Sequence, residues 1–167
     1  EIFSSTKFSF FIIQKRLREL AFLNKGTKII LNDFTQKKEK TNVFKYDGGI
    51  LEFVEFLDEK REKLKNKNNN DLFKKPIFID GKKQNLDIEC SLKWNASYSE
   101  DIYAYTNNIY QKDGGTHLLG FRSALTRVIN KYAIEQNLLK KNKLSISGDD
   151  IKEGLTCVLS IKIPDPK

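Results

Sequence analysis

Alternation of apolar and polar residues marks two segments of the chain. In residues 86–94, apolar side chains alternate with charged or small polar ones, and residues 155–163 repeat the pattern. Successive side chains of a strand point to opposite faces, so both segments predict strands with one buried face. Shorter apolar runs predict further strands at about residues 27–32, 76–80 and 101–107.

Apolar residues at three- and four-residue spacing predict two longer helices. The first runs from about Phe10 to Asn24, with an apolar stripe of Phe10, Ile13, Leu17, Leu20 and Ala21. The second runs from Thr116 to about Asn137, with a stripe of Leu118, Phe121, Leu125, Val128, Ile129 and Tyr132. At about 100° per residue, Arg122 falls on the edge of this stripe and Arg127 on the opposite face. A shorter helix is expected from Ile50, and a helical or turn segment at residues 147–150.

The second long helix follows a turn at Asp113, Gly114 and Gly115. The glycines adopt backbone angles that branched residues avoid, so the chain can reverse sharply there. Thr116 is expected at the N-cap, where its hydroxyl accepts a hydrogen bond from a helix amide. His117 lies just inside the helix start, which disfavours its protonated form and favours a structural hydrogen-bonding role.

A charged stretch divides the chain. Residues 33–41 have few apolar side chains to bury, which is typical of a linker or an exposed hairpin. We therefore expect one unit at residues 1–41 and a second at 42–167. The second is predicted to be α+β, with about four strands and helices packed on one face. The Asn- and Lys-rich residues 63–70 are interpreted as a solvated loop.

Composition adds little about chemistry. The net charge is +8, from 30 basic and 22 acidic residues, which favours a polyanionic partner only weakly because an AT-rich genome also enriches Lys and Asn. Cys90 and Cys157 are expected to be buried free thiols, and one histidine with two distant cysteines predicts no zinc cluster. Neither a signal peptide nor a membrane-spanning run is evident. Asp149 and Asp150 are interpreted as helix-capping rather than catalytic groups.

A set of motifs extends along nearly the whole chain. The most informative are Asn107-Asn-Ile109, Asp113-Gly-Gly-Thr-His-Leu118 and Gly120-Phe-Arg-Ser-Ala-Leu-Thr-Arg127, joined by Asp47-Gly-Gly-Ile50, Trp94-Asn95, Gly148-Asp-Asp150, Glu153-Gly-Leu155 and Pro164-Asp-Pro166. Together they resemble the B subunit of bacterial-type DNA gyrase, a type IIA DNA topoisomerase.

The resemblance implies an architecture that periodicity cannot supply. Residues 1–41 would be the C-terminal piece of a GHKL-type ATPase domain plus a linker. Residues 42–167 would be the transducer domain, similar to the second domain of ribosomal protein S5, with a left-handed βαβ crossover. The chain would stop before the family's Gln-x-Lys loop, whose lysine reaches the terminal phosphate of the nucleotide.

The resemblance also implies a function for the parent protein. The parent would be an ATP-hydrolysing enzyme that uses ATP and Mg²⁺ to pass one DNA duplex through another and to introduce negative supercoils. Its partners would be double-stranded DNA bound without sequence preference, the gyrase A subunit and, on binding ATP, a second copy of itself. It would act in the cytoplasm at the nucleoid, or in an organelle such as a plastid if the source is eukaryotic, without a membrane partner.

Residues 1–46 carry none of the family's ATPase motifs, and the sequence has no Gly-x-x-x-x-Gly-Lys-Ser/Thr loop. We therefore expect no catalytic, cofactor-binding, metal-binding or DNA-cleavage residue in this chain.

Arg122 is the strongest functional candidate. In gyrase-like proteins the arginine of Gly-Phe-Arg lines the cavity for the transported duplex, where it would offer charge to phosphates without reading bases. Its alternative role is an intramolecular salt bridge on the helix flank. Arg127 and Lys131 are weaker candidates, because an outward charged face is usually only solvated.

Trp94, Tyr103 and Tyr105 could stack on bases, but their strand positions favour sheet packing.

Two alternative identities stand beside the gyrase B resemblance. The topoisomerase IV B-type subunit shares the Asp-Gly-Gly-Thr-His core and is one of them. A stand-alone S5-like nucleic-acid-binding module is the other, since it would explain the charge and the fold.

Overall fold

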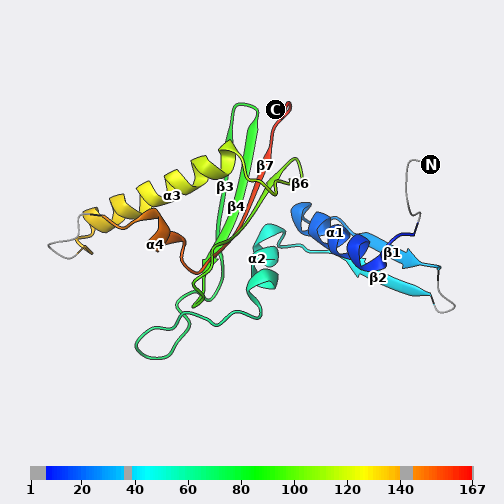
Figure 1. The fold of residues 1–167 in the computed structure, drawn as a ribbon, viewed down its shortest axis with the longest axis horizontal. Coiled ribbons are helices and arrows are strands. Elements are labelled where there is room, and N and C mark those ends of the chain that lie inside the picture. Colours follow the sequence, from blue (N-terminus) through cyan, green and yellow to red (C-terminus); the bar gives the residue numbers. More distant parts are fainter. Residues whose placement is uncertain (1–6, 36–38, 140–144, 167) are drawn as a thin grey trace. The chain divides into compact units, whose positions relative to one another are not determined.

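The computed structural model describes residues 7–35, 39–139 and 145–166, and its elements are shown in Figure 1. The chain forms two compact units, Glu1–Phe53 and Val54–Lys167. Each unit has its own buried apolar residues.

The first unit contains one helix packed beside a two-stranded hairpin. Helix α1 spans Phe10–Leu23, close to the predicted limits, and strands β1 (Ile29–Asp33) and β2 (Lys40–Phe44) are antiparallel. The ring of Phe22 lies between two others, at 3.6 Å from the centroid of Tyr46 and 4.7 Å from that of Phe53. Phe22 is 1% exposed, so this aromatic stack is the centre of the first unit.

The expected boundary between residues 41 and 42 falls inside β2. Thr41 pairs with Asn32 across the hairpin, and its hydroxyl donates a hydrogen bond to the side chain of Asn32 at 2.9 Å. A division there would separate two paired strands. Of the two expectations for this stretch, a linker or an exposed hairpin, the described residues Asp33, Lys40 and Thr41 form the hairpin. The compact units divide after Phe53, within helix α2 (Ile50–Asp58).

The second unit is built on a five-stranded sheet. Its strands are β3 (Ile77–Lys83), β4 (Leu86–Trp94), β5 (Asp101–Thr106), β6 (Ile109–Tyr110) and β7 (Leu155–Lys162). The order is β3-β4-β7-β5-β6, and every neighbouring pair is antiparallel except β5 and β7. The fifth strand, β6, was not expected, because two residues are too few to give an alternation signal.

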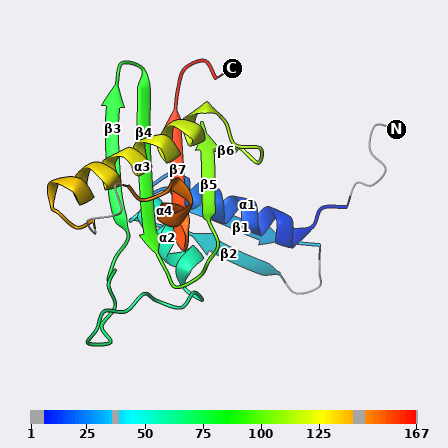
Figure 2. The ribbon, with the colours of Figure 1, turned by 60° about the vertical axis from the view of Figure 1, so that its left-hand side comes forward.

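Helices α3 (Thr116–Glu135) and α4 (Gly148–Lys152) cover one face of this sheet, as Figure 2 shows. Both lie in the connection between the parallel strands β5 and β7, so the unit contains a βαβ crossover. Under α3, the core consists of Cys90, Leu92, Leu155, Cys157 and Leu159, with Phe121 and Leu125 of α3 packed against them. The predicted strands are confirmed, and one face of each supplies this core. The expectation of a single buried face is wrong, because Ser91 of β4 and Thr156, Val158 and Ser160 of β7, on the other face, are 2% exposed or less.

The predicted apolar stripe of α3 is wrong at two positions. Val128 is 60% exposed and Tyr132 is 58% exposed, whereas Leu118 and Ala133 are buried. The periodicity identifies a broad apolar stripe but does not say which of its edges faces the sheet. In the structure the buried edge is the one that includes Ala133, which leaves Val128 and Tyr132 on the outside.

Candidate nucleic-acid interface

The turn before α3 forms at the predicted residues. The Gly114 amide donates to the Gln111 carbonyl at 3.1 Å, and Gly114 has a φ of 76°, where a side chain would be strained. Asp113 and Gly115 complete the turn. Thr116 was expected to be the N-cap, but Gly115 takes that position. The Leu119 amide donates to the Gly115 carbonyl at 3.1 Å, so the helix ladder starts at Gly115, and the Thr116 hydroxyl lies one residue too late to cap it.

Arg122 lies on the second turn of α3 and binds Glu100, the residue before β5. The Arg122 Nε donates to Glu100 Oε1 at 2.9 Å, and Nη2 donates to Oε2 at 2.7 Å. The Arg122 side chain remains 37% exposed and that of Glu100 25% exposed. The helix-flank ion pair weighed as an alternative is therefore present, and the guanidinium still reaches the surface.

Arg127 and Lys131 are both exposed on α3. Lys131 lies 3.8 Å from Glu135, a loose pair on an exposed face, and Arg127 makes no ion pair within the described ranges. Four residues separate the two, so they share one side of the helix, whereas Arg122 lies about 140° away from Arg127. The structure therefore does not gather the three basic candidates on one side of α3.

The aromatic residues of the strands are engaged within the second unit. Tyr105 is 1% exposed, and the Trp94 Nε1 donates to the Ile151 carbonyl of α4 at 2.8 Å. The rings of Tyr103 and Tyr110 lie 6.2 Å apart in a tilted arrangement. The expectation of sheet packing is confirmed for Trp94 and Tyr105, which do not present a stacking platform for bases.

His117 and the acidic pair have structural surroundings. The hydrogen-bonding role expected of His117 is not found at Nε2, which is buried without a hydrogen-bond partner in the described part of the chain, and burial lowers the pKa of His117 below its usual range. Asp150 and Ser147 form a reciprocal capping box at the start of α4, and Asp149 pairs with Lys152 at 3.0 Å. The capping interpretation is confirmed for Asp150, whereas Asp149, among the described residues, caps nothing through its side chain and pairs with Lys152 instead.

Cys90 and Cys157 are buried and unoxidised, with their Sγ atoms 3.6 Å apart. Their mutual hydrogen bond, together with burial, raises the pKa of Cys157 well above its ordinary value, so this thiol stays protonated. Within the described ranges, no cluster of His, Cys, Asp and Glu has the grouping of a metal site. A helix that could cross a membrane is likewise not found in this part of the chain.

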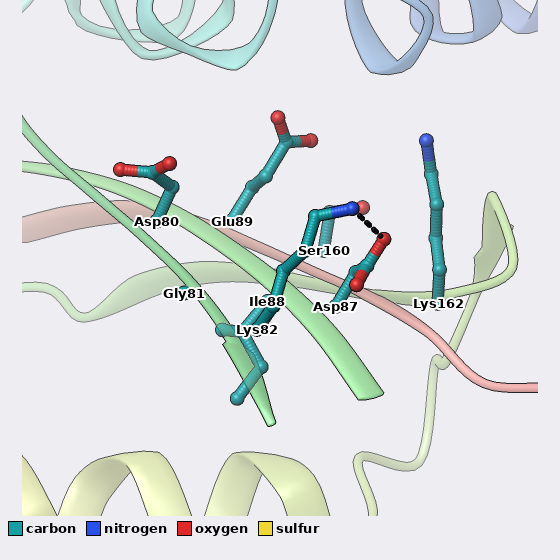
Figure 3. A pocket seen from close by; sticks show the side chains of 8 residues that line it. All are labelled: Asp80, Gly81, Lys82, Asp87, Ile88, Glu89, Ser160 and Lys162. Carbon is teal, nitrogen blue, oxygen red and sulfur yellow. Dashed lines mark hydrogen bonds and ion pairs between the residues drawn. The ribbon is translucent and has the colours of Figure 1, made fainter. Parts of the chain in front are cut away.

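A hollow of about 250 Å³ lies on the second unit's sheet, and Figure 3 shows the residues that line it. Asp80 and Glu89 face each other across β3 and β4, and Lys82 pairs with Asp87 at 3.0 Å. Lys162 is a second lysine in the lining, so two lysines stand against three carboxylates and the formal charge of the hollow is −1. This mixed lining offers no concentration of positive charge for phosphates, so the candidate interface remains the surface of α3 that carries Arg122.

Sequence reasoning did not identify the partners in two ion pairs of the second unit. One pair is that of Glu100 with Arg122, for which only an unspecified salt bridge on the helix flank was considered. The other joins Asp58, at the end of α2, to Lys93 of β4 with an Nζ–Oδ2 distance of 3.1 Å. No local pattern identifies either pair, because each partner alone has the sequence context of a solvated surface charge.

Comparison with known proteins identifies the family. The DNA gyrase B family model matches residues 49–167. The DNA gyrase B subunit of Chlamydia pneumoniae is 46% identical over 171 residues, covering all of this chain and 20% of that protein. The corresponding protein of Clostridium acetobutylicum is 45% identical and is covered to 25%. The chain thus spans about a fifth to a quarter of the length of the curated relatives it matches.

A solved structure extends the similarity to the fold of nearly the whole chain. The 43K ATPase domain of Thermus thermophilus gyrase B, in complex with an aminocoumarin, aligns with a TM-score of 0.82 at 36% identity, covering 99% of this chain and 43% of that one. The family model covers most of the chain, and relatives share nearly half of its residues. The chain therefore belongs to the DNA gyrase B family.

Proposed function

We propose that this chain is the transducer region of a DNA gyrase B subunit, preceded by the end of its ATPase domain. In this role it couples ATP binding and hydrolysis in the parent subunit to DNA strand passage and negative supercoiling. The βαβ crossover with helices on one face of the sheet supports an S5-like fold for the second unit. Its sequence carries no phosphate-binding loop, so we assign ATP and Mg²⁺ to the rest of the parent's ATPase domain.

The observation that carries the DNA-facing part of this proposal is the position of Arg122. The guanidinium is fixed on the flank of α3 by Glu100 and is still 37% exposed. An arginine held in this way meets a phosphate without having to order a long side chain at the moment of contact. A contact between an arginine and a phosphate does not depend on the base sequence, which suits an enzyme that transports DNA of any sequence.

The parent's partners follow from the same proposal. They are double-stranded DNA, the gyrase A subunit and a second copy of the parent that associates on binding ATP, all in the bacterial cytoplasm. Helix α3 would then face the duplex that passes between the two copies.

The decisive experiment replaces Arg122 by Gln in the full-length parent protein assembled with the gyrase A subunit. Gln keeps a hydrogen bond to Glu100 but removes the positive charge. We expect the ratio of DNA-stimulated to DNA-free ATP turnover to fall about tenfold, with a parallel loss of supercoiling, since one charge-assisted contact contributes about 1.5–3 kcal/mol. Arg127→Gln is the matched control and should change the ratio about twofold at most. An unchanged ratio in Arg122→Gln removes this arginine from the mechanism.

Two further measurements separate this proposal from its alternatives. Introduction of negative supercoils into a relaxed plasmid supports gyrase, whereas decatenation without supercoiling supports a topoisomerase IV subunit. Submicromolar, salt-dependent DNA binding by the 167-residue chain alone would instead favour a stand-alone nucleic-acid module, which its +8 charge permits.

A further inference from the structure

Glu100 holds Arg122 in a fixed orientation. The two residues are 22 positions apart, and the two parallel hydrogen bonds between them use Nε and Nη2 of the guanidinium. A bidentate carboxylate–guanidinium pair fixes the plane of the guanidinium as well as its distance. The neighbouring carboxylate, Asp101, pairs with a different arginine, Arg61.

The hydrogen bonds to Glu100 leave one edge of the guanidinium unused. Nη1 and the second hydrogen of Nη2 remain as donors, and Arg122 has no further polar contact within the described residues. Because the side chain is 37% exposed, this outer edge can bind a phosphate while Glu100 stays in place. The carboxylate therefore orients the arginine without occupying the whole of its binding edge.

Glu100 also changes the charge that DNA meets at a distance. The pair has no net charge, so its attraction for a distant phosphate largely cancels and only the short-range hydrogen bonds remain. An unpaired arginine would attract the duplex from further away and release it more slowly. A transported duplex must leave as well as enter, so a short-range contact is better suited to passage than a strong electrostatic grip.

We propose that Glu100 is a positioning residue for Arg122: it orients the guanidinium toward a DNA phosphate and cancels its charge at long range. This inference rests on the function proposed above for Arg122. It predicts that removing the carboxylate's charge strengthens DNA binding. The same change should lower the maximal stimulation of ATP turnover by bound DNA.

The test uses the full-length parent protein with the gyrase A subunit and a linear duplex of fixed length. Wild type, Glu100→Gln, Arg122→Gln and the double variant are compared by DNA-stimulated ATP turnover over a series of salt concentrations. For Glu100→Gln we expect the apparent Kd for DNA to fall severalfold at low salt. Its salt dependence should steepen by at most about 0.9, the value for one net positive charge at the DNA backbone, because the charge of Arg122 is no longer cancelled. The maximal stimulation should decrease at the same time, because the guanidinium is no longer fixed.

Three comparisons isolate the effect of Glu100. Glu100→Asp retains the charge but shortens the reach, so it should keep the wild-type salt dependence and lose maximal stimulation. Glu59→Gln removes the same charge at an exposed position after α2. It should leave the salt dependence and the maximal stimulation near wild type. On the Arg122→Gln background, Glu100→Gln should have no further effect. Thermal unfolding of each variant checks that the fold is intact.

The outcomes distinguish this inference from the proposed function. If Arg122→Gln weakens DNA stimulation but Glu100→Gln leaves affinity, salt dependence and maximal stimulation unchanged, Glu100 has no positioning role and the function of Arg122 stands. An effect of Glu100→Gln that persists without Arg122 is a general charge effect and also overturns the inference. If Arg122→Gln itself has no effect, the proposed role of Arg122 fails first.

Discussion

The buried ion pair between Asp58 and Lys93 should be a principal determinant of stability in the second unit. Asp58 is 2% exposed, and the Lys93 side chain is 9% exposed. The side-chain amide of Asn95 also donates to Asp58 Oδ1 at 2.7 Å, and the Thr156 hydroxyl donates to the same atom at 3.4 Å. Lys93 Nζ lies 3.1 Å from Oδ2 without good hydrogen-bond geometry, so the contact is mainly electrostatic.

Asp58→Ala should lower the free energy of unfolding by about 3–5 kcal/mol. The loss comes mostly from the Lys93 ammonium, which would stay buried without its counter-charge. A typical domain is stable by about 5–15 kcal/mol, so the effect should be large. Adding Lys93→Met removes the stranded charge, and the double variant should therefore be more stable than Asp58→Ala alone. Glu55→Ala, at an exposed position of the same helix, should change the free energy by about 0.5 kcal/mol or less.

The assay is urea unfolding followed by the fluorescence of Trp94. It is the sole tryptophan of the chain, lies next to Lys93 in β4 and contacts α4, so its signal reports on the second unit. A signal specific to one unit is needed because two compact units need not unfold in a single transition. A cost below about 1 kcal/mol for Asp58→Ala, or a double variant no more stable than the single one, would refute the electrostatic reasoning.

Two further predictions concern the backbone and a titrating group. Gly154→Ala should lower the unfolding free energy by about 3 kcal/mol or more, because Gly154 has a φ of 73° and an added Cβ would lie 2.3 Å from the Asn95 carbonyl oxygen. Gly81→Ala, where an added Cβ meets nothing within 4 Å, is the control in the same urea assay and should be nearly neutral. His117, the sole histidine, should titrate by NMR below its ordinary value of 6.5, since burial lowers its pKa. Below that value the unfolded chain binds a proton that the folded chain does not, so stability should fall as the pH drops from about 7 to 5.5. His117→Gln should flatten this dependence, and a pKa at or above 6.5 would contradict the assignment.

The individual elements of this protein were largely predictable from local pattern. The alternation of residues 86–94 and 155–163 identified β4 and β7, and the spacing of apolar residues identified α1 and most of α3. The motifs between Asp47 and Pro166 together identified the family, because a set of specific residue types carries more information than hydrophobicity. The division at residue 41 failed because local charge does not reveal that two strands pair across the charged stretch.

The sequence by itself therefore determined the elements, the family resemblance and the choice of Arg122. Only the tertiary structure decided how these residues are used. It paired Glu100 with Arg122 and Asp58 with Lys93, and it buried one edge of the α3 stripe while exposing the other. The physical reason is that hydrophobic periodicity reports only on the local structure of a short stretch of consecutive residues. The partner of a charge is instead set by which strands and helices the topology brings together.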